Sequence, residues 1–204
     1  MIDLGLPLLI VSTENLQHNF RPIAFCVSWA ESTQQVTLML EKIRDFLYEH
    51  FNFRLRPKYI LTDNSDALIT GCRKAVDHDY VHLGCHFHIG KRVREKAMSK
   101  DLKDKKKCLF FGVKILKNSP TLEFFQRAWA IIKKYWEDNE VNAEFIKTFE
   151  SEYIKKPVQW HYGAAFPGKS RTNNSLESGN NIIKNYLNRK SHNIKEFFGK
   201  CVTL

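Results

Sequence analysis

Two short apolar runs with a polar stretch between them open the chain. Pro7–Ser12 and Pro22–Trp29 have the length and apolar content of buried strands. After them the hydrophobic positions change to helical spacing, and a helix capped by Ser32 or Thr33 is predicted to end near His50. The chain is therefore expected to begin with two strands followed by a long helix.

Strands and helices then alternate. Pro57–Thr62 and Tyr80–Cys85 are short apolar runs that predict two further strands. Each is followed by a helical pattern, over Ala67–Val76 and His88–Ser99 respectively. Short strands that alternate with helices are typical of an α/β sheet, so the predicted fold class is α/β.

The pattern from residue 100 onward is almost entirely helical. The charged stretch Lys100–Lys107 predicts an exposed loop or a frayed helix. Pro120–Trp136 and Val141–Lys155 carry aromatic residues at helical spacing, which favours a core role for these rings over base stacking. The remaining predicted elements are a loop over Gly163–Arg171 and two helices, Ser175–Leu187 and Ile194–Val202.

This order predicts one domain that carries a large insertion, a size that suits 204 residues. Residues 1–90 would form the first part of the α/β core. Residues 91–165 would form an all-helical insertion, and residues 166–204 would return to the core with its last helices.

Composition and charge narrow the class of protein. Hydrophobic residues make up 43% of the chain, which is enough for a buried core and argues against disorder. No apolar run is long enough to span a bilayer, and the opening residues lack the basic region of a secretory signal. Five cysteines at irregular spacings indicate no disulfide framework, so a reducing compartment is expected. The net charge of +10 favours a polyanionic partner, of which nucleic acid is the commonest.

Asp63 is the first residue that could carry chemistry. It directly follows an apolar strand, and sites in open α/β sheets form at the carboxyl ends of strands. A carboxylate in that position suits Mg²⁺ or Mn²⁺, which prefer hard oxygen ligands. The alternative is that Asp63 or Asn64 only caps the helix that follows.

Glu177 is a second candidate carboxylate, predicted in the first turn of a helix. Asn174 and Glu177 have capping-box spacing, although Asn replaces the usual Ser or Thr. The residues therefore allow either a helix cap or a metal ligand.

Cys85 and His88 form a C-x-x-H element where a strand meets a helix. Both residue types bind Zn²⁺, but a structural zinc site needs four ligands and no second pair completes one. The alternative is a cysteine that packs and a histidine that bonds to backbone.

Basic residues gather in clusters that could neutralise phosphates. A solvated surface explains any one cluster equally well, but several clusters on a chain of charge +10 favour DNA contacts. The candidate DNA-binding residues are Lys91, Arg92, Arg94, Lys184, Arg189 and Lys190.

Taken together, these segments resemble the transposase domain of Mutator-like elements. The resemblance rests on Pro7–Val11, Pro22–Ser32, Tyr59–Gly71, Cys85–Lys91, Thr172–Asn181 and Arg189. Leu61–Ala67 looks like the family motif that bears the second catalytic Asp, and Cys85–His88 looks like its C-x-x-H motif. Thr172–Ser178, with Asn173 and Asn174, looks like the motif that bears the catalytic Glu.

The resemblance implies an RNase H-like core of the DDE type with a helical insertion between the Asp and the Glu. It makes Asp63 and Glu177 catalytic metal ligands for two Mg²⁺ or Mn²⁺ ions held roughly 3.5–4 Å apart. It implies no zinc. The implied partners are transposon ends and target DNA, with a possible homo-oligomer in the parent protein and a nuclear location.

One departure from the family limits the expected activity. The family's first catalytic Asp lies on the first strand of the sheet, upstream of the segment that matches Pro7–Val11. We therefore expect a transposase fragment without its first strand, inactive as it stands. The alternatives are a domesticated transposase-derived DNA-binding or regulatory protein without catalysis, and a small zinc-binding module around Cys85 and His88.

Overall fold

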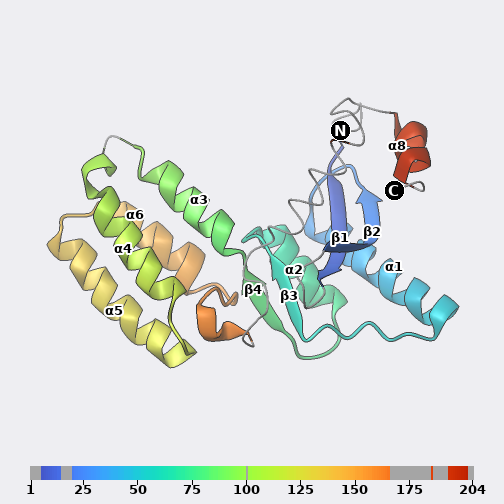
Figure 1. Ribbon diagram of the computed structural model, residues 1–204, viewed down its shortest axis with the longest axis horizontal. Coiled ribbons are helices and arrows are strands. Elements are labelled where there is room, and N and C mark those ends of the chain that lie inside the picture. Colours follow the sequence, from blue (N-terminus) through green and yellow to red (C-terminus); the bar gives the residue numbers. More distant parts are fainter. Residues whose placement is uncertain (1–5, 15–19, 100, 166–184, 186–192, 202–204) are drawn as a thin grey trace. The chain divides into compact units, whose positions relative to one another are not determined.

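The computed structural model describes residues 6–14, 20–99, 101–165, 185 and 193–201. These residues form two compact units, each with its own core (Figure 1). The hairpin unit is drawn from Met1–Arg56, Asp66–Asp77 and Asn173–Leu204, and the helical unit from Pro57–Ser65 and His78–Thr172.

The hairpin unit is built on an antiparallel strand pair with helices packed against it. Its elements are β1 (Leu8–Glu14), β2 (Phe20–Val27), α1 (Thr33–Phe51), α2 (Asp66–Ala75) and α8 (Ile194–Cys201). Within β1, Leu9 packs with Val36 and Met39 of α1, whereas Leu8 packs with Phe197 of α8. Successive side chains of a strand point to opposite faces, so the continuous apolar run in β1 is explained by burial of both faces.

Helix α1 begins and ends where local chemistry requires. The Ser32 side chain accepts a hydrogen bond from the Gln35 backbone N–H at 3.3 Å, which caps the first turn. Asn52 ends the helix in the left-handed region, with φ 48°. Helix α2 packs closely on α1, because a Cβ placed on Gly71 would lie 2.6 Å from Val36 Cβ.

The helical unit combines a parallel strand pair with a helical bundle. Its elements are β3 (Tyr59–Thr62), β4 (Val81–Gly84), α3 (His86–Lys96), η1 (Lys103–Lys105), α4 (Lys106–Lys117), α5 (Leu122–Asp138), α6 (Ala143–Phe149), η2 (Glu150–Ile154) and η3 (Tyr162–Ala164). Thr121 caps α5 by accepting from the Phe124 N–H, and Asn142 caps α6 by accepting from the Glu144 N–H.

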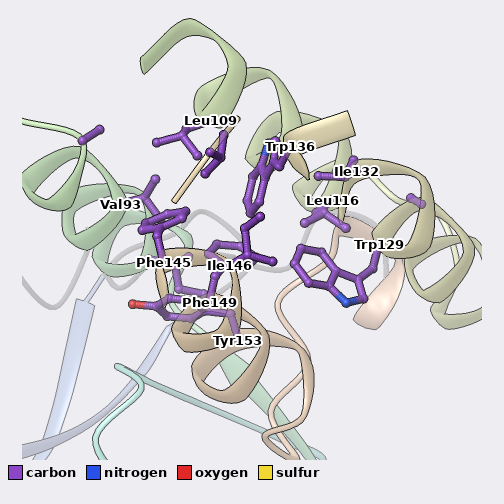
Figure 2. Close-up of a cluster of buried hydrophobic side chains, with 14 of the residues drawn as sticks. Val93, Leu109, Leu116, Trp129, Ile132, Trp136, Phe145, Ile146, Phe149 and Tyr153 are labelled. Carbon is purple, nitrogen blue, oxygen red and sulfur yellow. The ribbon is translucent and has the colours of Figure 1, made fainter. Parts of the chain in front are cut away.

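Aromatic rings fill the core of the helical unit. Figure 2 shows Trp129 and Trp136 of α5 beside Phe145 and Phe149 of α6. The Trp136 and Phe149 rings meet edge to face with centroids 5.0 Å apart, and both side chains are almost fully buried. The predicted core role is confirmed for these rings but not for two others of the set, Phe124 and Tyr135, which are 51% and 38% exposed.

The architecture is mixed α/β, as the alternation of strands and helices predicted. The strands and the helices up to residue 99 fall within a few residues of their expected bounds. Helix α4 was not predicted, because Lys100–Lys107 was assigned to a loop or frayed helix and the following apolar stretch to no element. The predicted helix Ser175–Leu187 lies outside the described residues apart from Asn185, and the proposed insertion boundaries stay predictions.

Candidate functional site

Asp63 and Cys85 leave the parallel strand pair at the same end. Thr62 lies opposite Gly84 in the β3–β4 register, so the next residue of each strand falls just beyond the sheet. The Cys85 N–H donates to the Thr62 carbonyl at 2.9 Å and closes the pair at this edge. The carboxyl ends of these two strands thus bring the predicted carboxylate and the start of the C-x-x-H element together.

The Asp63 side chain is half-buried and forms one local hydrogen bond. Its Oδ1 accepts from the Ser65 N–H at 2.9 Å, which is an Asx turn just before α2. Within the described part of the chain, Oδ2 makes no hydrogen bond or ion pair. The turn explains one carboxylate oxygen and leaves the other available to a ligand.

Hydrogen bonds beneath Asp63 fix the backbone of the turn. The Thr62 hydroxyl donates to the Asp63 carbonyl at 2.6 Å and lies 2.7 Å from His82 Nε2. A hydroxyl has one proton to give, so His82 Nε2 must carry the proton of the second bond. Asn64 is buried, and its side-chain N–H donates to the Glu152 carbonyl at 2.9 Å.

The C-x-x-H element spans the N-terminal turn of α3. Cys85 is fully buried at the N-cap position, and His88 is half-buried with its ring edge-on to Phe87. Between them, the buried His86 ring bonds through Nε2 to the Trp160 carbonyl. Cys85 is therefore shielded from solvent at the junction, which both interpretations of this element allow.

Metal-binding side chains do not gather into a complete site among the described residues. No three His, Cys, Asp or Glu side chains of this part of the chain come together in a way that could hold a metal ion. Asp63 belongs to no such group in this part of the chain. Glu177, Asn173 and Asn174 lie outside the described residues.

The exposed face of α3 is basic. Ile89 and Val93 point into the core, each 1% exposed, whereas Lys91, Arg92 and Arg94 are exposed. These three are the described members of the predicted DNA-binding set; Lys184, Arg189 and Lys190 lie outside the described residues. Helical spacing thus separates an apolar stripe from a cationic one.

A surface pocket lies between α3 and the α6–η2 segment. It has a volume of about 510 Å³ and is lined by Arg92, Glu95, Lys96, Thr148, Glu152 and Tyr153. Burial raises the pKa of the Tyr153 hydroxyl, and the nearby Arg92 guanidinium partly opposes that shift. Both cationic and anionic side chains line the pocket, so its charge does not indicate one class of ligand.

The sequence does not indicate the residues whose hydrogen bonds hold the turn at Asp63 in place. The sequence indicates Asn64 only as a candidate helix cap, and no local pattern singles out His82 or Trp160. The strand register provides the missing signal, because β3 and β4 pair in parallel and place Thr62 within reach of His82.

Comparison with known proteins adds no relative to this description. No protein family, curated protein or solved structure matches the chain. Among the described residues, none of the helices has both the length and the apolar character to cross a membrane. The functional argument therefore depends on the geometry of the site and on the motifs in the sequence.

Proposed function

We propose that this chain is part of a DDE-type DNA transposase related to those of Mutator-like elements. The observation that carries the proposal is the parallel β3–β4 pair, which places Asp63 beside the C-x-x-H element at one end of the two strands. These are the two described motifs of the resemblance, and they lie more than twenty residues apart in sequence.

The order of elements supports an RNase H-like core. The antiparallel β1–β2 pair is followed by helix α1, strand β3, helix α2 and strand β4, and β4 pairs in parallel with β3. A helical bundle then follows β4, at the position where the resemblance implies an all-helical insertion.

Asp63 and Glu177 would hold Mg²⁺ or Mn²⁺. Such ions, when bound, stabilise negative charge on the attacking and leaving oxygens of phosphoryl transfer. The chain itself contributes the Asx turn that orients Asp63 and the Thr62 hydroxyl that fixes its backbone. Lys91, Arg92 and Arg94 would hold backbone phosphates of DNA and position it without reading sequence.

Divalent metal binding tests the proposal on the chain as it stands. We expect the chain to bind Mn²⁺, measured as the loss of the free-ion signal in electron paramagnetic resonance. Asp63→Asn and Glu177→Gln should each weaken binding by about tenfold, because one or two carboxylates usually anchor such an ion. Asp101→Asn is the matched control, since it removes an exposed carboxylate of the same unit and should leave binding unchanged.

Equal Mn²⁺ binding by the wild type and by Asp63→Asn would exclude Asp63 as a ligand and sink the proposal. The same measurement bears on a second candidate, a transposase-derived DNA-binding protein without catalysis. The exposed basic face of α3 favours that candidate, because phosphate contacts need no carboxylate. DNA binding that Asp63→Asn leaves intact in a chain that binds no Mn²⁺ would support it.

A further inference from the structure

Four large aromatic side chains are exposed at the C-terminal end of α1. Phe46, Tyr48, Phe51 and Phe53 are 53%, 49%, 67% and 54% exposed, and we call them the α1 aromatic surface. In Figure 1 the last turns of α1 extend past the β1–β2 hairpin. Single exposed apolar residues are ordinary, but four exposed rings at one helix end call for an explanation.

The backbone holds these rings in place. The Phe46 ring lies 4.5 Å from the His50 ring and 6.0 Å from the Phe51 ring, measured between centroids. After the left-handed Asn52, the Phe53 N–H donates to the Leu47 carbonyl at 3.1 Å, which folds the chain back against the helix end. The rings are therefore presented on a hydrogen-bonded helix terminus.

Three cations lie close to these aromatic residues in sequence, together with one exposed carboxylate, Glu49. The Arg54 guanidinium carbon lies 5.7 Å from the centroid of the Tyr48 ring, and Lys42 and Arg56 are exposed nearby in sequence. As far as the structure describes the chain, none of these three cations forms an ion pair. Exposed rings and uncommitted cations thus occur together in this segment.

We infer that the α1 aromatic surface binds an unpaired stretch of nucleic acid, with bases stacked on the rings and phosphates held by Lys42, Arg54 and Arg56. Base stacking on aromatic rings combined with a basic track is the general mode of single-strand recognition. Bases within a duplex are already stacked on each other, so ring faces can receive only unpaired ones. This inference does not depend on the carboxylate site of the proposed function.

A second copy of the chain is a weaker match to this surface. Each copy carries a net charge of +10, and the exposed charges around the rings are mainly positive, so two such surfaces repel each other. A polyanion with flat apolar faces can pair with the cations and stack on the exposed rings.

The test compares two probes of equal charge with the full chain. We expect fluorescence anisotropy to show tighter binding of a labelled 12-nucleotide oligo-dT than of a 12-nucleotide abasic strand with the same phosphates. The double variant Phe51→Ala/Phe53→Ala should bind oligo-dT at least about fivefold more weakly and lose the preference, since stacking contributes appreciably per base. Arg54→Gln/Arg56→Gln should weaken binding of both probes.

Matched controls separate this surface from general charge and from folding. Phe124→Ala removes a ring of similar exposure in the other unit, and Lys117→Gln/Lys134→Gln removes two exposed cations there. Both controls should keep the preference for oligo-dT, and so should Asp63→Asn if the carboxylate site is separate. Circular dichroism should show the same helix content for every variant compared.

Three results would overturn the inference. The first is equal binding of both probes, or no binding, by the wild type. The second is a preference that survives Phe51→Ala/Phe53→Ala. The third is a dimer in sedimentation that this double variant dissociates, which would assign the surface to a second copy.

Discussion

At the scale of single residues, the position of a side chain relative to strand ends decides what it can do. The apolar run before Asp63 is enough to place it at the end of a strand, and β3 does end one residue earlier. The buried supports of the turn are different, because the Asn64 bond to the Glu152 carbonyl joins residues far apart in sequence. Residue type and local pattern carry no information about such a partner.

Cys72 provides a prediction that depends on pH. This thiol is 4% exposed in α2, and burial raises its pKa from the ordinary 9.0 to about 11. Because the folded state holds the proton more tightly, the resulting stability is fully present below pH 9 and is lost as pH rises toward 11. Between pH 9 and pH 11, the free energy of unfolding should therefore fall by up to about 2–3 kcal/mol less in Cys72→Ala than in the wild type.

Urea denaturation between pH 8 and pH 11 measures this effect. Tyrosines titrate over the same range, so the informative quantity is the difference in slope between the wild type and Cys72→Ala. In the native state at pH 8, Cys72 should also react slowly with a thiol reagent until the chain is unfolded. An identical alkaline slope in both proteins would show that the thiol titrates as if it were in water.

At the scale of elements, helix α4 shows how tertiary packing completes a weak local signal. Its central residues, Cys108–Leu116, are mainly apolar with Gly112 and Lys114 among them, so hydrophobic periodicity does not separate helix from strand. The structure uses Leu109, Gly112 and Leu116 as one buried stripe against α5. Helix α5, which lies later in the sequence, buries this stripe and so stabilises α4 as a helix.

Gly112 and Gly90 form a matched pair for testing that packing. A Cβ on Gly112 would lie 2.7 Å from Trp136 Nε1 and 2.8 Å from Ile132 Cγ2, whereas a Cβ on Gly90 of α3 would meet nothing within 4 Å. We expect Gly112→Ala to lower the free energy of unfolding by roughly 1–3 kcal/mol through overpacking. Gly90→Ala should raise it by roughly 0.5–1 kcal/mol through helix propensity.

Urea denaturation of both variants by circular dichroism makes the comparison. Both substitutions add the same methyl group to a helix, so a difference of sign isolates the contact with α5. Stabilisation by Gly112→Ala would mean that α4 and α5 do not approach as closely as this packing requires.

At the scale of the whole molecule, the two units differ in the size of their cores. The helical unit buries an extended cluster that includes Trp136, Phe149 and Trp160. Among the described residues of the hairpin unit, the largest cluster has only four buried members, Leu9, Val36, Met39 and Ile43. Buried apolar area is the main stabilising contribution, so the helical unit should be the more stable of the two.

Hydrogen exchange followed by mass spectrometry tests this difference. We expect backbone amides in the middle of α5 to exchange at least about tenfold more slowly than those in the middle of α1, because local opening costs more in the larger core. Both helices are long and capped, so the comparison is not one of frayed ends. Equal protection of α1 and α5 would show that the two units unfold together.

Local periodicity and hydrogen-bonding residue types are enough to predict the α/β class, the main strand–helix alternation and the cap at Ser32. It also singled out Asp63 and the C-x-x-H element. Only the tertiary structure decided that these meet at one sheet edge, that helix α4 exists, and that Cys85 is buried. Those outcomes depend on pairing between distant segments, which has no signature in the local order of residues.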